Sequence, residues 1–279
     1  MATTAFQTIY RPEYIAIFER GQSLLRSTAV TEANIKGTSA VFLTAGSGAA
    51  SAVTRGANGF IPARNNSLTQ STATLTEWHD LPQATRFTTD MSQGDIRRIM
   101  QETSVKVLNR KIDDQIIVEL DTATNDTGTS ATASLSMVAK SLTILGNNDV
   151  DIADADNLFG LITPAFMGYL MQTKEFASAD YVEVKPFTGP ARKMLRWYGV
   201  NWIVHSGLTG LAGATEKCYL YHRNALGHAA NTAELNIAAG YNDEQDYYFA
   251  RASMFMGAKL LQNSGVVQMK HDGSAYAAA

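Results

Sequence analysis

SQGDIRRIMQETSVKVLNRKIDDQIIVELDT, residues 92–122, is the stretch that decides the fold. Its apolar residues recur three or four positions apart, which is the spacing that places them on one face of an α-helix. Ser92 and Asp95 stand three residues apart at its start, a capping-box pattern that marks a helix N-terminus. There is no Pro in the stretch, and its one Gly is Gly94. It therefore predicts a single helix of about 45 Å, much longer than the average helix of a globular protein.

The charged residues of this predicted helix are of both signs. They are Arg97, Arg98, Lys106, Arg110 and Lys111 against Glu102, Asp113, Asp114 and Glu119. Mixed charges three and four positions apart are typical of a solvated helix face with ion pairs between successive turns. We therefore expect these residues to face solvent and not to form a nucleic-acid contact.

The chain before the helix has little with which to build a core. VFLTAGSGAASAVTRGANGFIPARNN, residues 41–66, is rich in Gly, Ala and small polar residues. A strand is expected at 38–44, and residues 72–91 read as extended, with a break at Pro82. Residues 36–91 thus form two extended limbs joined by a long tip. A loop of this length is uncommon inside a compact domain, so we expect the tip either to be disordered or to be ordered by something outside its own subunit.

The two ends of the chain show different patterns. Residues 1–35 read as an arm, in which Pro12 precedes a helical pattern too short to carry a core alone. At the other end, residues 246–261 predict a long strand, residues 262–265 a turn and residues 266–272 a returning strand. We expect these last two strands to form a hairpin.

The region between the helix and the last strands alternates helices with strands, which indicates an α/β unit at 130–240. An amphipathic helix is expected from Leu135 to a C-cap at Gly146. A buried strand at 157–163 precedes a helix with Thr163 as N-cap and Pro164 at its first position. Further strands are expected at 200–206 and 217–223.

Composition and charge narrow the class of protein. Of 279 residues, 45% are hydrophobic and 18% charged, with a net charge of −3 and a pI near 6.0. This balance argues against a basic nucleic-acid surface or a polybasic membrane anchor. No apolar run approaches the ~18 residues of a membrane span, and the N-terminus has no signal-peptide pattern. We expect no membrane partner and a protein that stays in a cytoplasm or is assembled in one.

Chemically reactive residues do not form a recognisable motif. Phosphate-binding, metalloprotease and nucleophile-elbow patterns are absent from the sequence. Cys218 stands alone and is expected to be a small buried residue and not a catalytic thiol. The spacing of His222 and His228 does not suit a metal site on one helix face, and both are expected at the surface or as caps. Four Asp residues in 149–156 read as a solvated acidic loop, because the Gly and terminal Glu of a calcium loop are missing. We expect no cofactor, no metal and no enzyme activity, although acid pairs from distant segments cannot be seen in a sequence.

The order of these parts resembles the major capsid protein of tailed double-stranded-DNA bacteriophages, the Hong Kong 97-type fold. FTTDMSQGDIRRIMQETSVKVLNRKIDDQIIVELDTA resembles the strand and spine helix of that family, and LFGLITPAFMGYLMQ resembles its axial strand and helix. ARASMFMGAKLLQNSGVVQMKHD is similar to its C-terminal strands. The resemblance implies an α+β fold of four parts: an N-terminal arm (1–35), an extended loop (36–91), a peripheral domain (92–129 and 241–279) and an axial domain (130–240).

The resemblance also implies a function. Copies of the chain would assemble through hexamers and pentamers into an icosahedral shell around phage DNA, so the protein would be part of the virion, assembled in the host cytoplasm. Expected partners are further copies of the chain, a portal protein, packaged DNA held by weak non-specific contacts, and a separate scaffolding protein. Some family members start with a scaffolding segment, whereas here the arm begins almost at Met1, so we expect scaffolding to be a separate protein or not to be needed. Alternatives are a nanocompartment (encapsulin-like) shell, an enzyme using residues 130–240, or a tail or adhesin component, which the long helix argues against.

In this family the extended loop lies over a neighbouring subunit. Arg55 and Arg64 are the only charged residues between positions 37 and 76, so they are candidates for ion pairs between subunits. Phe60 and Trp78 are further candidates for inter-subunit contact. The alternative for the two arginines is a solvated position with no partner.

Overall fold

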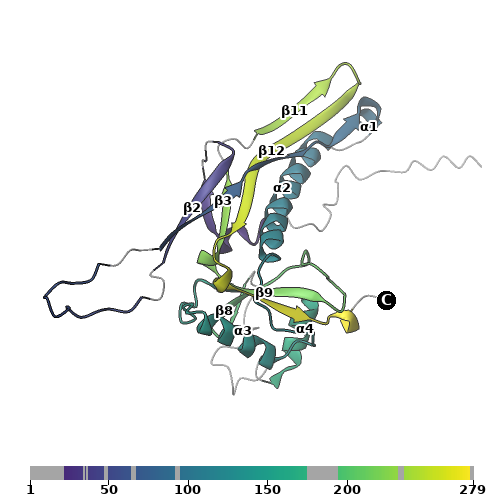
Figure 1. Ribbon diagram of the computed structural model, residues 1–279. Coiled ribbons are helices and arrows are strands. Elements are labelled where there is room, and N and C mark those ends of the chain that lie inside the picture. The colour runs from purple at the N-terminus through teal and green to yellow at the C-terminus, as the bar shows by residue number, and fades with distance from the viewer. Residues whose placement is uncertain are drawn as a thin grey trace, which may run out of the picture.

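The computed structural model describes residues 22–33, 35, 37–46, 50–63, 67–91, 95–174, 194–231 and 236–276. One large sheet lies along the long helix, a second lies beyond the C-terminal end of that helix, and a separate two-stranded hairpin projects to one side (Figure 1). Within these residues no helix is both long and apolar enough to span a membrane.

Helix α2 (Ile96–Leu120) confirms the long helix, but it begins later than the sequence pattern suggests. Asp95 is the N-cap, because its side chain accepts a hydrogen bond from the backbone N–H of Arg98 at 3.2 Å. Ser92, the predicted cap, lies outside the described residues. One face is buried, and its apolar members are Met100, Leu108, Ile112, Ile116, Ile117 and Leu120. On the solvated side Arg98 pairs with Glu102 one turn later at 3.8 Å, as the charge pattern predicts.

The first large sheet lies along α2 and is organised by one strand, β12 (Tyr247–Leu260). The other strands are β1 (Val30–Ala33), β10 (Leu226–Ala230), β11 (Asn236–Asn242), β4 (Thr76–Asp80) and β5 (Gln83–Thr85). Strands β10 and β11 pair with successive parts of β12, and β4 and β5 also pair with β12. At fourteen residues β12 is long enough to hold all four neighbours. The break between β4 and β5 falls at Pro82, as predicted.

The second sheet has the order β13-β9-β6-β8-β7. Its strands are β6 (Leu158–Ile162), β7 (Leu195–Trp197), β8 (Val200–Val204), β9 (Glu216–His222) and β13 (Val266–His271). Two helices, α3 (Leu135–Asn147) and α4 (Pro164–Gln172), belong to the same region (Figure 1). Every residue of β6 is buried. The predicted cap of α4 is confirmed, because the Thr163 side chain accepts from the N–H of Phe166.

The predicted C-terminal hairpin is wrong. Strand β13 pairs with β9, from Val266 opposite Tyr221 to His271 opposite Glu216, and β12 belongs to the other sheet. The short 3-10 helix at Asn263–Gly265 redirects the chain, and the backbone N–H of Leu261 donates to Ala225. A turn signal shows that the chain changes direction but does not identify the strand it will pair with.

The strand pairing places two segments in other parts of the fold than the sequence analysis expected. Strands β10 and β11 lie in the sheet beside α2, so residues 226–240 do not belong with the 130–240 unit. Residues 266–271 lie in the second sheet and not with the spine helix.

Three local expectations are also corrected. Residues 86–91 form a short helix, α1 (Arg86–Met91), because the Thr85 hydroxyl accepts from the N–H of Thr88 and starts a helical turn. Helix α3 continues past Gly146 to a C-cap at Asn148. His228 is fully buried in β10 and not at the surface.

The charge pattern of α2 predicts that Asp113 faces solvent, and this prediction is wrong. Asp113 is 1% exposed and connects the N-terminal segment to α2. Its carboxylate accepts hydrogen bonds from the Ser23 hydroxyl at 2.6 Å and from the N–H groups of Leu24 and Leu25, both at 3.2 Å. A buried charge is tolerated only when it is well paired in this way.

The same carboxylate also reaches the second sheet through His205, which follows β8. The Nδ1 of His205 accepts from the N–H of Gly207 at 2.9 Å, so Nε2 carries the proton and faces Asp113 at 3.4 Å. Burial acts to raise the pKa of Asp113, but the hydrogen bonds from His205, Ser23, Leu25 and Leu24 outweigh it and the pKa is lowered. Asp113 thus joins three segments of the subunit.

We expect Asp113→Asn to lower the free energy of unfolding by about 2–3 kcal/mol, because an amide cannot accept all of these hydrogen bonds. Denaturant unfolding measures the change, and Asp114→Asn, on an exposed neighbouring position of α2, is the matched control. Equal stability of the two variants would contradict the connecting role of Asp113.

We expect the free energy of unfolding to decrease as the pH is lowered from about 6.5 to about 4, because of His228. Burial, followed by the charge of Arg26, lowers the pKa of His228 from 6.5 to about 4. In this interval the unfolded chain binds a proton that the folded protein does not, so acid favours unfolding. The stabilisation from Asp113 is lost only below its unfolded pKa of 3.8.

Unfolding measured at a series of pH values checks this expectation. The non-titrating variant His228→Leu should show a flatter profile than the wild type between pH 6.5 and 4. Superimposable profiles would exclude His228 as the source.

Candidate subunit-interaction surface

The projecting hairpin consists of β2 (Ser39–Gly46) and β3 (Ser67–Thr74), paired without interruption. Residues opposite one another in an antiparallel pair share a face of the ribbon. On one face Ala40, Phe42 and Ala73 are buried, and they pack with Ala229 of β10. This face attaches the hairpin to its own subunit.

The opposite face of the hairpin is apolar but uncovered. Val41, Leu43 and Leu68 are 52%, 71% and 74% exposed. The register places Leu68 opposite Ala45 and Leu43 opposite Gln70, so the three side chains are on the same side of the ribbon. Contiguous exposed apolar residues of this kind mark sites of contact with another protein. We call Val41, Leu43 and Leu68 the open face.

Two glycines of the first sheet allow the hairpin base to lie close to it. The Phe42 ring lies directly over Gly227 of β10, where a Cβ would come within 2.9 Å of the ring. At Gly257 of β12 a Cβ would collide with the carbonyl oxygen of Thr74. Close packing at its base fixes the direction in which the hairpin projects (Figure 1).

Beyond the hairpin, residues 50–63 form a tip in which every residue is exposed. Its backbone is held by two hydrogen bonds, from the N–H of Gly56 to Phe60 and from the N–H of Gly59 to Gly56. Val53, Phe60 and Ile61 are 61%, 78% and 66% exposed. The tip therefore adds apolar surface to the open face and contributes nothing to the core of its own subunit.

Of the four residues predicted for inter-subunit contact, the structure brings two together. Arg55 and Phe60 both lie in the exposed tip, and Arg55 has no hydrogen bond or ion pair with a described residue. Arg64 lies outside the described residues. Trp78 is elsewhere, on β4, where it packs partly buried against the core of its own subunit, with the Lys111 ammonium 4.1 Å from its ring centroid. These contacts are within the subunit, and a contact of Trp78 with a neighbouring subunit stays a prediction.

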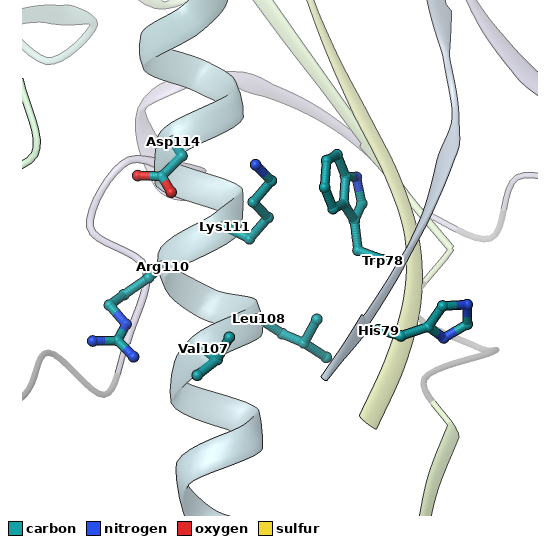
Figure 2. Close-up of a pocket in the computed structure, with 7 residues that line it drawn as sticks. All are labelled: Trp78, His79, Val107, Leu108, Arg110, Lys111 and Asp114. Carbon is teal, nitrogen blue, oxygen red and sulfur yellow. The ribbon is translucent and has the colours of Figure 1, made fainter. Parts of the chain in front are cut away.

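Trp78 lines a half-open pocket of about 270 Å³ between β4 and α2 (Figure 2). The pocket is lined by Trp78, His79, Val107, Leu108, Arg110, Lys111 and Asp114. His79 is engaged elsewhere, with Ser253 at 2.8 Å and Glu77 at 3.1 Å. Lys111 lies over the indole, and the set contains no nucleophile with an adjacent base. Its acid–base residue types are His79, Lys111 and Asp114, and the contacts of His79 and Lys111 are structural.

Two further reactive groups, Cys218 and Glu216, are buried in the second sheet. Cys218 is buried, as predicted, and burial raises the pKa of its thiol to about 12, which makes it a poor nucleophile. Buried Glu216 accepts from the Thr163 hydroxyl at 2.5 Å and from the N–H of Ala212 at 2.7 Å. These bonds hold α4 and the second sheet together.

The acidic loop points its carboxylates at separate partners. Asp154 accepts from Asn157 at 2.7 Å, and Asp156 pairs with Arg196 at 3.2 Å. Among the described residues no three His, Cys, Asp or Glu side chains converge as metal ligands would.

The open face was missed by reasoning from the sequence alone, although a signal was present. A strand with one buried face alternates apolar and polar residues, whereas Val41, Phe42 and Leu43 are consecutive apolar residues. Consecutive apolar positions in a strand indicate that both faces are to be covered. The subunit covers the face with Phe42 and leaves the other open.

Comparison with known proteins gives a consistent result. A family model described as phage capsid protein matches residues 2–273. No curated protein matches the sequence. Among solved structures, one from Mycobacterium phage Che8 is similar with a TM-score of 0.77 at 14% identity, covering 96% of this chain and 98% of the other.

Two further structures have the same fold. The capsid asymmetric unit of cyanophage Pam1 matches with a TM-score of 0.74 at 10% identity, covering 98% of both chains. The capsid of a native GTA particle matches with a TM-score of 0.71 at 15% identity, covering 96% of both. These likenesses confirm the Hong Kong 97-type fold that the order of elements implies. Because the family model spans nearly the whole sequence, the chain belongs to the phage capsid protein family.

Proposed function

We propose that this chain is a major capsid protein whose copies assemble through hexamers and pentamers into an icosahedral shell enclosing phage DNA. The observation that carries the proposal is the projecting hairpin, which exposes Val41, Leu43 and Leu68 on one face and an apolar tip at its end. A monomer gains nothing from exposing this surface to water, whereas a repeated contact between identical chains would bury it in every subunit. The family model favours a shell of a phage over a nanocompartment holding an enzyme.

The positive charge of the tip indicates what kind of surface it would contact on a neighbouring subunit. Arg55 is exposed and is not paired with a described residue, and no acidic residue lies between positions 37 and 76. An acidic surface on the neighbouring subunit would therefore complement the tip and help to select its position. Arg64 is the second candidate for such an ion pair.

A shell around phage DNA would have further partners besides copies of this chain. The net charge of −3 suits a lining that holds packaged DNA only weakly, because strong binding requires many Lys or Arg contacts to phosphate. We propose a separate scaffolding protein and a portal protein as further partners, assembly in the host cytoplasm, and no enzyme activity.

Replacing residues 50–63 with a short Gly-Ser linker should leave a folded subunit that no longer forms shells. The tip makes no contact with the core, so its removal should not change unfolding. Circular dichroism and denaturant unfolding measure the subunit, and size-exclusion chromatography with negative-stain electron microscopy measures assembly. Loss of the fold would show that the tip belongs to its own subunit, and normal shells would show that the tip is dispensable.

A second variant tests the open face itself. Leu43→Glu with Leu68→Glu should abolish assembly and leave subunit stability within about 0.5 kcal/mol, as expected for surface positions. Val118→Glu, at a Val on α2 that is 61% exposed, is the control for adding charge to an exposed apolar position. Assembly of the double variant to the same extent as Val118→Glu would exclude the open face as an interface.

A further inference from the structure

The tip contains the one Asn-Gly pair of the sequence, Asn58–Gly59. Both residues are exposed, and the Asn58 side chain makes no hydrogen bond with a described residue. Gly59 has a φ of +74°, in the region that favours glycine. With no Cβ at Gly59, nothing shields its backbone nitrogen from the preceding side chain.

From this geometry we propose that Asn58 is a deamidation site, reactive in the free subunit and closed by assembly; the second half rests on the proposed function. The Gly59 nitrogen gives its proton to water and attacks Cγ of Asn58, forming a C–N bond. The side-chain amide bond breaks and its nitrogen leaves as ammonia, which gives a five-membered succinimide. Water then adds to either ring carbonyl and opens the ring to aspartate or isoaspartate. Water is the one co-reactant and no electrons are transferred.

The fold of the tip controls this reaction. The N–H of Gly59 donates to Gly56 at 2.9 Å, and this bond must open before the nitrogen can attack. In the free subunit no side chain of residues 50–63 is buried, so the turn is held by exposed backbone bonds alone and belongs to the least stable part of the molecule. A neighbouring subunit lying over the tip would hold the turn closed and slow the attack.

Two other asparagines provide a contrast within the same molecule. The side-chain oxygen of Asn263 accepts from the backbone N–H of Thr124 at 2.9 Å, and its side-chain NH2 donates to the Thr124 hydroxyl at 2.7 Å. The side-chain NH2 of Asn125 donates to the backbone carbonyls of Asn263 and Val266 at 2.8 and 3.2 Å. Both side chains are fixed and neither precedes a glycine, so both should react more slowly than Asn58.

Deamidation would change the charge of the interaction surface. The new carboxylate would stand three residues from Arg55 in a stretch whose two charges are both positive. It would reduce the net positive charge that the proposed acidic partner surface requires. Subunits that remain free for long would thus become less able to assemble.

The test follows the loss of side-chain amide by peptide mass spectrometry in the full-length subunit and in purified shells, incubated in the same mildly alkaline buffer. In the free subunit, Asn58 should lose its amide faster than Asn125 and Asn263. In shells the rate at Asn58 should be about tenfold lower, the effect of a contact that stabilises the closed turn by about 1.4 kcal/mol.

The reactivity of Asn58 in the free subunit and its protection by assembly can be contradicted independently. If Asn58 in the free subunit is no faster than Asn263, the modification site is overturned whether or not shells form. If Asn58 reacts equally in both forms, closure by assembly is overturned. Failure to form shells even when the proposed scaffolding protein is co-expressed contradicts the proposed function, while the comparison within the free subunit still decides the chemistry.

Two variants test the consequence for assembly. Asn58→Gln keeps a neutral amide whose cyclisation needs a larger ring, so it is the uncharged reference for a substitution at this position. Asn58→Asp carries the charge of the product, and it should assemble more slowly than Asn58→Gln. Equal assembly rates for the two variants would overturn the charge effect.

Discussion

A two-stranded ribbon has two faces, and this subunit can cover only one of them in the β2–β3 hairpin. Phe42 fills the covered face by packing over Gly227, and the absence of a side chain at Gly227 and Gly257 lets the ribbon lie close to the sheet. The other face is left with Val41 and Leu43 in water. Exposed apolar surface favours association, so this single constraint is the basis for proposing the hairpin as a surface for another molecule.

The core of the subunit lies apart from residues 50–63, all of which are exposed. Helix α2 buries one face against the first sheet, and β12 gathers the strands of that sheet along the helix. Asp113 then connects the N-terminal segment, α2 and His205 through hydrogen bonds that lie entirely within the chain. A body whose core is closed within the chain, with an extension outside that core, suits a subunit that folds first and assembles later.

Patterns of nearby residues allowed part of this structure to be predicted. The spacing of apolar residues identified α2, and Thr163–Pro164 identified the start of α4, because each depends on local chemistry. Contacts between distant segments were beyond the same reasoning. The pairing of β13 with β9 and the burial of Asp113 depend on which segments meet in space. A buried aspartate that accepts four hydrogen bonds has the same letter in a sequence as one that faces solvent. For the candidate surface, Arg55 and Phe60 were placed in the tip from sequence, while the open face required the register of the hairpin.

The most direct test of the account is hydrogen–deuterium exchange of residues 39–74, measured in the free subunit and in assembled shells. The account predicts that the amides of residues 50–63 exchange rapidly in the free subunit and become protected in shells, while those of α2 are protected in both. Equal exchange of residues 50–63 in the two forms would contradict it, because the surface left open by the subunit would then also be open in the shell.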